Sequence, residues 1–147
     1  GQQPGKRIGL YVHPAHQRGA AVKYTKSILV IDDARQIRDI LWFSLKQEGY
    51  RAILAENGVR GMDALFNSKE AFDLVILDVM MPKMDGFETL KRIRSANHPA
   101  SSTPVIMLTA KAQKTDVIQG MTGGADDYVV KPYKFAELLS KIKRLIG

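Results

Sequence analysis

The chain has 147 residues, of which 45% are hydrophobic and 25% are charged, as in one ordinary globular domain with a sizeable core. It contains no cysteine, which excludes disulfides, thiol chemistry and thiolate metal sites and fits a reducing compartment, so we expect a cytoplasmic protein. No apolar stretch approaches the roughly 18 residues of a membrane span, and no signal-peptide pattern opens the chain.

The formal net charge of +7 is concentrated at the start of the chain. Residues 1–26 contain five basic residues and no acidic residue, whereas the remainder contains 17 basic and 15 acidic residues. We interpret 1–26 as a flexible basic linker or tail and 27–147 as a single domain. A basic arm can contact phosphates non-specifically, but a solvated linker is the more common use of such a segment, so nucleic-acid binding is not expected.

From Ser27 onward, apolar runs alternate with segments of helical spacing. The first expected helix, at 35–48, has Ile37, Leu41 and Leu45 on one face and ends at Gly49. The expected strands are 27–32, 51–55, 73–77, 104–108 and 127–130. The expected helices that follow them are 35–48, 59–67, 87–95, 113–121 and 134–146. Five strand–helix units with continuous apolar strands predict an α/β fold with a doubly wound parallel sheet that is covered on both faces.

Polar residues follow the first, third, fourth and fifth strands. They are Asp32 and Asp33, Asp78, Thr109, and Lys131. In an open parallel sheet, ligands bind beyond the carboxyl ends of the strands, and a strand order that makes these strands neighbours places all five side chains in one cleft.

The chemistry of such a cleft is that of a divalent cation and a phosphoryl group. Three carboxylates repel one another, and their pKa values rise unless a cation offsets the charge. Mg²⁺ prefers oxygen ligands, so Asp32 and Asp33 would hold it. Asp78 can act as ligand and as nucleophile, while Lys131 and Thr109 can contact phosphoryl oxygens.

Each of these residues also has a structural interpretation. Asp78 and Thr109 could each cap a following helix, the Asp32–Asp33 pair could be turn residues, and Lys131 could be a surface lysine. Their coincidence at one sheet edge favours the functional interpretation. The Lys131–Pro132 step, in a tight turn, is a candidate for a cis peptide bond.

Residues 27–146 resemble the receiver domain of two-component response regulators, the family that includes the single-domain chemotaxis regulator. The carrying motifs are Val30-Ile31-Asp32-Asp33, Leu77-Asp78-Val79-Met80-Met81-Pro82-Lys83-Met84-Asp85-Gly86, Leu108-Thr109-Ala110 and Gly124-Ala125-Asp126-Asp127-Tyr128-Val129-Val130-Lys131-Pro132. The resemblance implies a flavodoxin-like sheet with strand order 2-1-3-4-5. It also implies that Asp78 accepts a phosphoryl group from a sensor histidine kinase.

The resemblance further implies a role for each matching residue. Asp33 would bind Mg²⁺ directly, Asp32 partly through water, and the backbone carbonyl of Met80 would complete the protein ligands. Thr109 and Tyr128 match the family's switch pair, which changes the surface formed by 113–121, 127–130 and 134–146. Met80 and Lys111 match positions that tune the lifetime of the phosphate.

Other function classes fit the sequence less well. A hydrolase that uses an aspartyl phosphate, as in the haloacid dehalogenase class, would have Asp-x-Asp after the first strand, where this chain has Asp32-Asp33-Ala34. A nucleotide- or flavin-binding domain would have a glycine-rich loop there. A receiver-like module that takes no phosphate would be expected to lack part of the residue set, and no part is missing. We expect no turnover of an external substrate.

The partners follow from the same resemblance. They are a sensor histidine kinase, an output domain or protein, and a second copy of the chain where receivers dimerise through the face of 113–121 and 134–146. Because the chain begins with Gly1, we expect it to be a piece of a longer protein. A stand-alone regulator and the carboxyl-terminal receiver of a larger protein both fit the sequence, and the leader before Ser27 favours the latter. In either case we expect the output to lie outside this chain.

Overall fold

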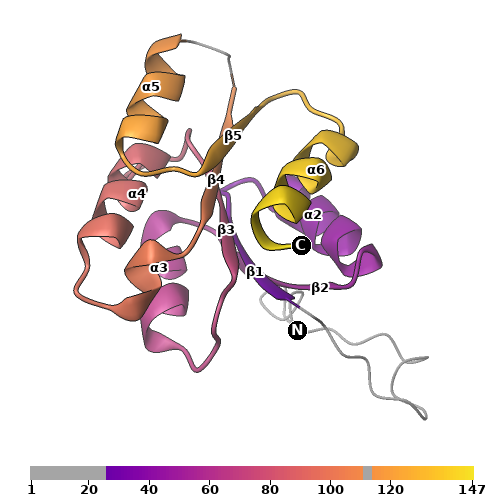
Figure 1. Cartoon of the computed structure of the whole chain (residues 1–147), viewed down its shortest axis with the longest axis horizontal. Coiled ribbons are helices and arrows are strands. Elements are labelled where there is room, and N and C mark those ends of the chain that lie inside the picture. Colours follow the sequence, from indigo (N-terminus) through magenta and orange to yellow (C-terminus); the bar gives the residue numbers. More distant parts are fainter. Residues whose placement is uncertain (1–25, 111–113) are drawn as a thin grey trace.

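The structure is a computed structural model and describes residues 26–110 and 114–147. Five strands form one sheet in the order β2-β1-β3-β4-β5, and every neighbouring pair is parallel (Figure 1). The strands are β1 (Lys26–Ile31), β2 (Tyr50–Ala55), β3 (Leu74–Asp78), β4 (Val105–Thr109) and β5 (Asp127–Val130). The α-helices are α2 (Arg35–Gln47), α3 (Gly58–Asn67), α4 (Gly86–Ser95), α5 (Lys114–Thr122) and α6 (Phe135–Ile146). The predicted flavodoxin-like doubly wound fold is confirmed.

Two layers of helices enclose the sheet. The helices α2 and α6 cover one face, and α3, α4 and α5 cover the other (Figure 1). Successive side chains of β1 point to opposite faces, so Ile28 and Val30 join the core beneath α2 and α6, while Leu29 and Ile31 join the other core. All four are fully buried, and burying each such side chain stabilises the fold by about 1.5–3 kcal/mol.

No boundary of a predicted strand or helix differs from the observed one by more than a single residue, and the predicted bounds of β5 are the observed ones. A short 3₁₀ helix, Pro99–Ser102, was not predicted, because a single turn is too short to show helical periodicity. It begins after His98, whose Nδ1 accepts the backbone N–H of Ala100 at 2.9 Å. The predicted leader falls almost wholly on residues 1–25, outside the described part of the chain.

No helix within 26–110 and 114–147 combines the length and the apolar character that crossing a membrane requires.

Candidate functional site

The strand order places the carboxyl ends of β1, β3, β4 and β5 side by side at one edge of the sheet. Asp78 is the last residue of β3 and pairs in register with Leu108, the residue before Thr109 at the end of β4. Asp32 follows β1, and Lys131 follows β5. Parallel pairing therefore collects into one place side chains that are up to 99 residues apart in sequence, counted from Asp32 to Lys131.

Three carboxylates meet at this edge. Asp32, Asp33 and Asp78 each offer an oxygen within 4.8 Å of the other two. Asp32 is fully buried and Asp78 is 2% exposed, whereas Asp33 is open to solvent. Asp33 is thus the exposed member of this carboxylate cluster, which we call the acidic pocket, and the other two members are buried.

Lys131 brings the positive charge to this acidic pocket. Its Nζ lies 2.7 Å from Oδ1 of Asp78 and 4.0 Å from Oδ2 of Asp32. The Lys131 side chain is 29% exposed, so the ammonium closes the pocket from the β5 side while it stays in reach of solvent. The Lys131–Pro132 peptide bond is cis.

Burial decides the protonation chemistry of the two inner carboxylates. It raises the pKa of Asp32 to about 6, an effect that the Ala34 backbone hydrogen bond partly offsets and the nearby charge of Asp78 increases. Burial also raises the pKa of Asp78, and the hydrogen bond and charge of Lys131 oppose that rise. A further cation in the acidic pocket would therefore stabilise the ionised form of both carboxylates.

The pocket has the donor set of a hard divalent cation. Oδ1 of Asp32 accepts the Ala34 N–H at 2.8 Å, but its buried Oδ2 has no hydrogen-bond partner in the described part of the chain. A buried carboxylate oxygen without a partner, beside two other carboxylates, would gain that partner from a cation that prefers oxygen ligands. Met80, two residues after Asp78 in the loop between β3 and α4, is 68% exposed.

The loop between β3 and α4 contains its own helix-capping residue, so Asp78 does not cap α4. Asp85, not Asp78, caps α4 by accepting the Glu88 N–H at 2.9 Å. Lys83 has φ +69 in a tight turn in which the Met84 N–H donates to the Pro82 carbonyl. The helix-cap interpretation of Asp78 is therefore wrong.

Two further residues support the site and were not singled out from the sequence. Arg38, in the first turns of α2, donates from Nη1 to the backbone carbonyl of Asp32 at 2.9 Å. Gly86 approaches the end of β3 so closely that a Cβ would lie 2.3 Å from the Asp78 carbonyl oxygen. Arg38 could have been found from the sequence, since it is a basic residue in the first turn of the helix that follows the Asp32–Asp33 loop. The glycine was visible only as part of a motif.

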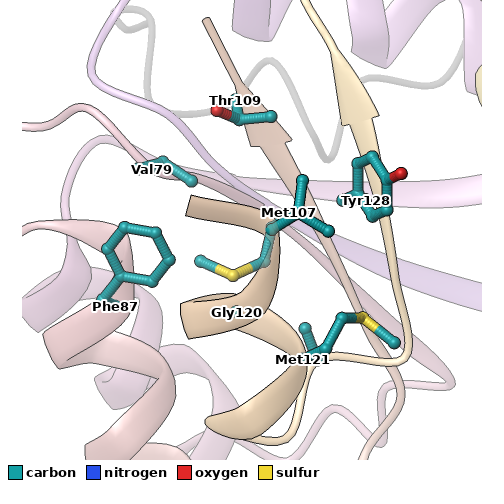
Figure 2. Close-up of a pocket in the computed structure, with 9 residues that line it drawn as sticks. Val79, Phe87, Met107, Thr109, Gly120, Met121 and Tyr128 are labelled. Atoms are coloured by element: carbon teal, nitrogen blue, oxygen red, sulfur yellow. The ribbon is translucent and has the colours of Figure 1, made fainter. Parts of the chain in front are cut away.

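Behind the acidic pocket lies a small apolar cavity of about 10 Å³ between β4, α4 and α5 (Figure 2). Met107, Phe87 and Gly120 form part of its lining, with Thr109 and Tyr128 at its edge. Thr109 is 4% exposed, and the half-buried Tyr128 directs its hydroxyl away from the other labelled side chains (Figure 2). The predicted residue Lys111 lies outside the described residues.

Comparison with known proteins matches residues 28–143 to the family described as the response regulator receiver domain. The transcriptional regulatory protein CpxR of Escherichia coli K12 is 41% identical over 119 residues, which cover 81% of this chain and 48% of that protein. The response regulator MprA of Mycobacterium sp. strain KMS is 40% identical over 119 residues, which cover 81% of this chain and 50% of that protein. The chain thus spans about half the length of these curated relatives.

Solved structures give the same result. The receiver domain of the Francisella response regulator 1452 superposes with a TM-score of 0.75 at 30% identity, covering 83% of this chain and 97% of that one.

Proposed function

This chain belongs to the response regulator receiver domain family, and from that membership we propose that Asp78 accepts a phosphoryl group from a sensor histidine kinase. The observation that carries the proposal is the 2.7 Å contact of Asp78 with Lys131 inside a cluster of three carboxylates. Asp78 is the member of that cluster that ends the central strand β3, and the helix that follows is capped by Asp85, not by Asp78.

The transfer uses the groups in place. A carboxylate oxygen of Asp78 attacks phosphorus, the bond from phosphorus to the kinase's histidine nitrogen breaks, and its electron pair stays on that nitrogen. Lys131 moves from the carboxylate to a phosphoryl oxygen, and the Thr109 hydroxyl donates to another. Phosphoryl transfer needs mainly positioning and charge neutralisation, which these residues supply.

Mg²⁺ is the cofactor that we propose for the pocket. Asp32, Asp33, Asp78 and the backbone carbonyl of Met80 would hold it, and the orphaned Oδ2 of Asp32 supports this assignment. When bound, the ion offsets the negative charge of the carboxylates and of the incoming phosphoryl group.

The output is a change of surface. The phosphoryl group adds up to two negative charges and three acceptor oxygens, and Thr109 moves to meet one of them. Tyr128 then turns inward behind it, and the face of α5, β5 and α6 changes shape. That face is where we expect an output domain or protein, or a second copy of the chain, to bind.

The remaining parts of the proposal concern context. Residues 27–147 act as the receiver and 1–26 as a linker, in the cytoplasm. The only chemistry is phosphoryl transfer to Asp78 and its hydrolysis. Met80 and Lys111 tune the access of the attacking water and thus the lifetime of the phosphate, so Lys111→Ala should change the dephosphorylation rate.

The test is phosphorylation with acetyl phosphate and Mg²⁺, followed by intact-mass and peptide mass spectrometry. We expect one phosphoryl group on wild type, none on Asp78→Asn, and one on the control Asp63→Asn, which alters an exposed carboxylate of α3. An unmodified wild type, or a modified Asp78→Asn protein, would refute the assignment.

A further inference from the structure

Lys141 of α6 lies against the ring of Tyr128. Its Nζ is 5.2 Å from the ring centroid, the geometry of a cation–π contact. The same Nζ donates to Oδ1 of Asp127 at 3.1 Å. One ammonium therefore touches both the ring of Tyr128 and the residue that precedes it on β5.

Asp127 fixes the position of that ammonium. Its Oδ1 also accepts the Tyr128 N–H at 2.8 Å, and its other oxygen pairs with Arg144 of α6. The side chains of Asp127 and Lys141 are 14% and 27% exposed, so solvent only partly screens the contact. Lys141 is thus held at one place over β5 and is not a mobile surface lysine.

The alternative position of the ring is the cavity at Thr109. Its volume of about 10 Å³ is that of a single water-sized probe, far too small for a phenol ring (Figure 2). Inward rotation of Tyr128 requires the cavity lining to move and the ring to leave Lys141. The outward orientation therefore has a cation–π contact with Lys141 that the inward orientation would lose.

We propose that Lys141 is a positioning residue that holds the Tyr128 ring in its outward orientation, so that α6 sets the resting bias of the switch. The inference deepens the proposed function and rests on Tyr128 being the switch residue. A cation–π contact at a partly exposed site corresponds to a bias of roughly two- to fivefold between the two orientations. Lys141 acts through Tyr128 and does not touch the phosphoryl site.

The first experiment measures ring orientation without phosphate, by NMR of isotope-labelled tyrosine rings, with Tyr128→Phe to assign the signal. In Lys141→Gln, we expect inward contacts from the Tyr128 ring to Met107 to increase by roughly two- to fivefold in population. Lys141→Arg keeps a cation at the ring and should restore the wild-type pattern. Lys143→Gln is the matched control, since Lys143 is exposed on the same helix and has no side-chain ion pair with the described residues.

The second experiment measures beryllofluoride affinity with Mg²⁺ on the same variants. Because apparent affinity rises with the population of the state that binds, Lys141→Gln should bind beryllofluoride more tightly, by up to the same factor. An unchanged ring signal in Lys141→Gln, or a changed one in Lys141→Arg, overturns the role of Lys141. A shifted ring with unchanged beryllofluoride affinity supports the role of Lys141 and overturns the coupling of Tyr128 to Asp78.

Discussion

At the scale of single residues, the acidic pocket is short of positive charge. Among the described residues, three carboxylates stand against the ammonium of Lys131, which leaves a formal charge of −2 when all are ionised. Lys131 satisfies Oδ1 of Asp78 at 2.7 Å but reaches Oδ2 of Asp32 only at 4.0 Å. Buried carboxylates without full compensation are costly in water-poor surroundings, so a divalent cation at the acidic pocket would lower that cost.

Lys131→Met should remove the cation that pairs with Asp78 in the described part of the chain. At neutral pH and without metal, we expect the free energy of unfolding to fall by about 1–3 kcal/mol, because the 3% exposed carboxylate loses its partner. Urea unfolding followed by circular dichroism measures this. Lys134→Met, which changes an exposed lysine of the same loop, should leave stability unchanged. Equal stability of Lys131→Met and wild type would contradict the pairing.

Metal affinity should depend on pH with a definite sign. Mg²⁺ binds the ionised carboxylate, and burial raises the pKa of Asp32 to about 6 and also raises that of Asp78. Protons therefore compete with the metal at a higher pH than at an ordinary aspartate, and affinity should fall as pH drops through about 6. Calorimetric titration between about pH 7.5 and about pH 5 measures this. A pH-independent affinity over that range would be inconsistent with metal binding at Asp32.

At the scale of elements, the start of α4 is pressed against the end of β3. The Gly86 N–H donates to the Val79 carbonyl at 2.9 Å. A Cβ at Gly86 would meet the Asp78 carbonyl oxygen at 2.3 Å and the Val79 Cα at 2.8 Å, both backbone atoms that a rotamer change cannot move. The position of Asp78 therefore depends on how closely α4 can begin beside β3.

Gly86→Ala should push α4 and β3 apart. We expect a loss of about 1–3 kcal/mol in unfolding free energy, as in other overpacked sites, together with weaker Mg²⁺ binding because Asp78 is displaced. Chemical denaturation and metal titration measure the two effects. Ser95→Ala, at the exposed far end of the same helix, is the control and should preserve both. Intact metal binding in Gly86→Ala would show that the close approach does not position the site.

At the scale of the whole molecule, the sheet order creates the site. β3 lies between two strands whose ends reach the acidic pocket, β1 with its acidic loop and β4 with Thr109, and β5 on the far side of β4 adds Lys131. Because the core on each face is built from all these strands, a ligand that bridges their ends stabilises the fold as a unit.

Beryllofluoride with Mg²⁺ should therefore raise the thermal unfolding temperature of the whole domain in one transition. At a hundredfold excess over the dissociation constant, the expected gain is about 2.7 kcal/mol. Differential scanning calorimetry measures it, and Asp78→Asn should show no gain from beryllofluoride. A gain of the same size in Asp78→Asn would place the ligand elsewhere.

Local sequence patterns were enough to predict the strands, the helices and the family. Continuous apolar runs predicted β3 and β4, and the helical spacing of Ile37, Leu41 and Leu45 predicted α2, because side-chain periodicity follows from local backbone geometry. Motif spacing also predicted the family and the residues of the acidic pocket. The family is confirmed, while the role of each residue stays a prediction.

Contacts between residues far apart in the sequence became visible in the folded chain alone. The cap of α4 by Asp85, the Arg38 contact with the loop after β1 and the fit of Gly86 against Asp78 depend on distances between segments. The contact of Lys141 with Tyr128 joins α6 to β5 in the same way. Such contacts form when helices and strands pack against one another. They depend on the three-dimensional register of one element against another, which no local sequence pattern contains.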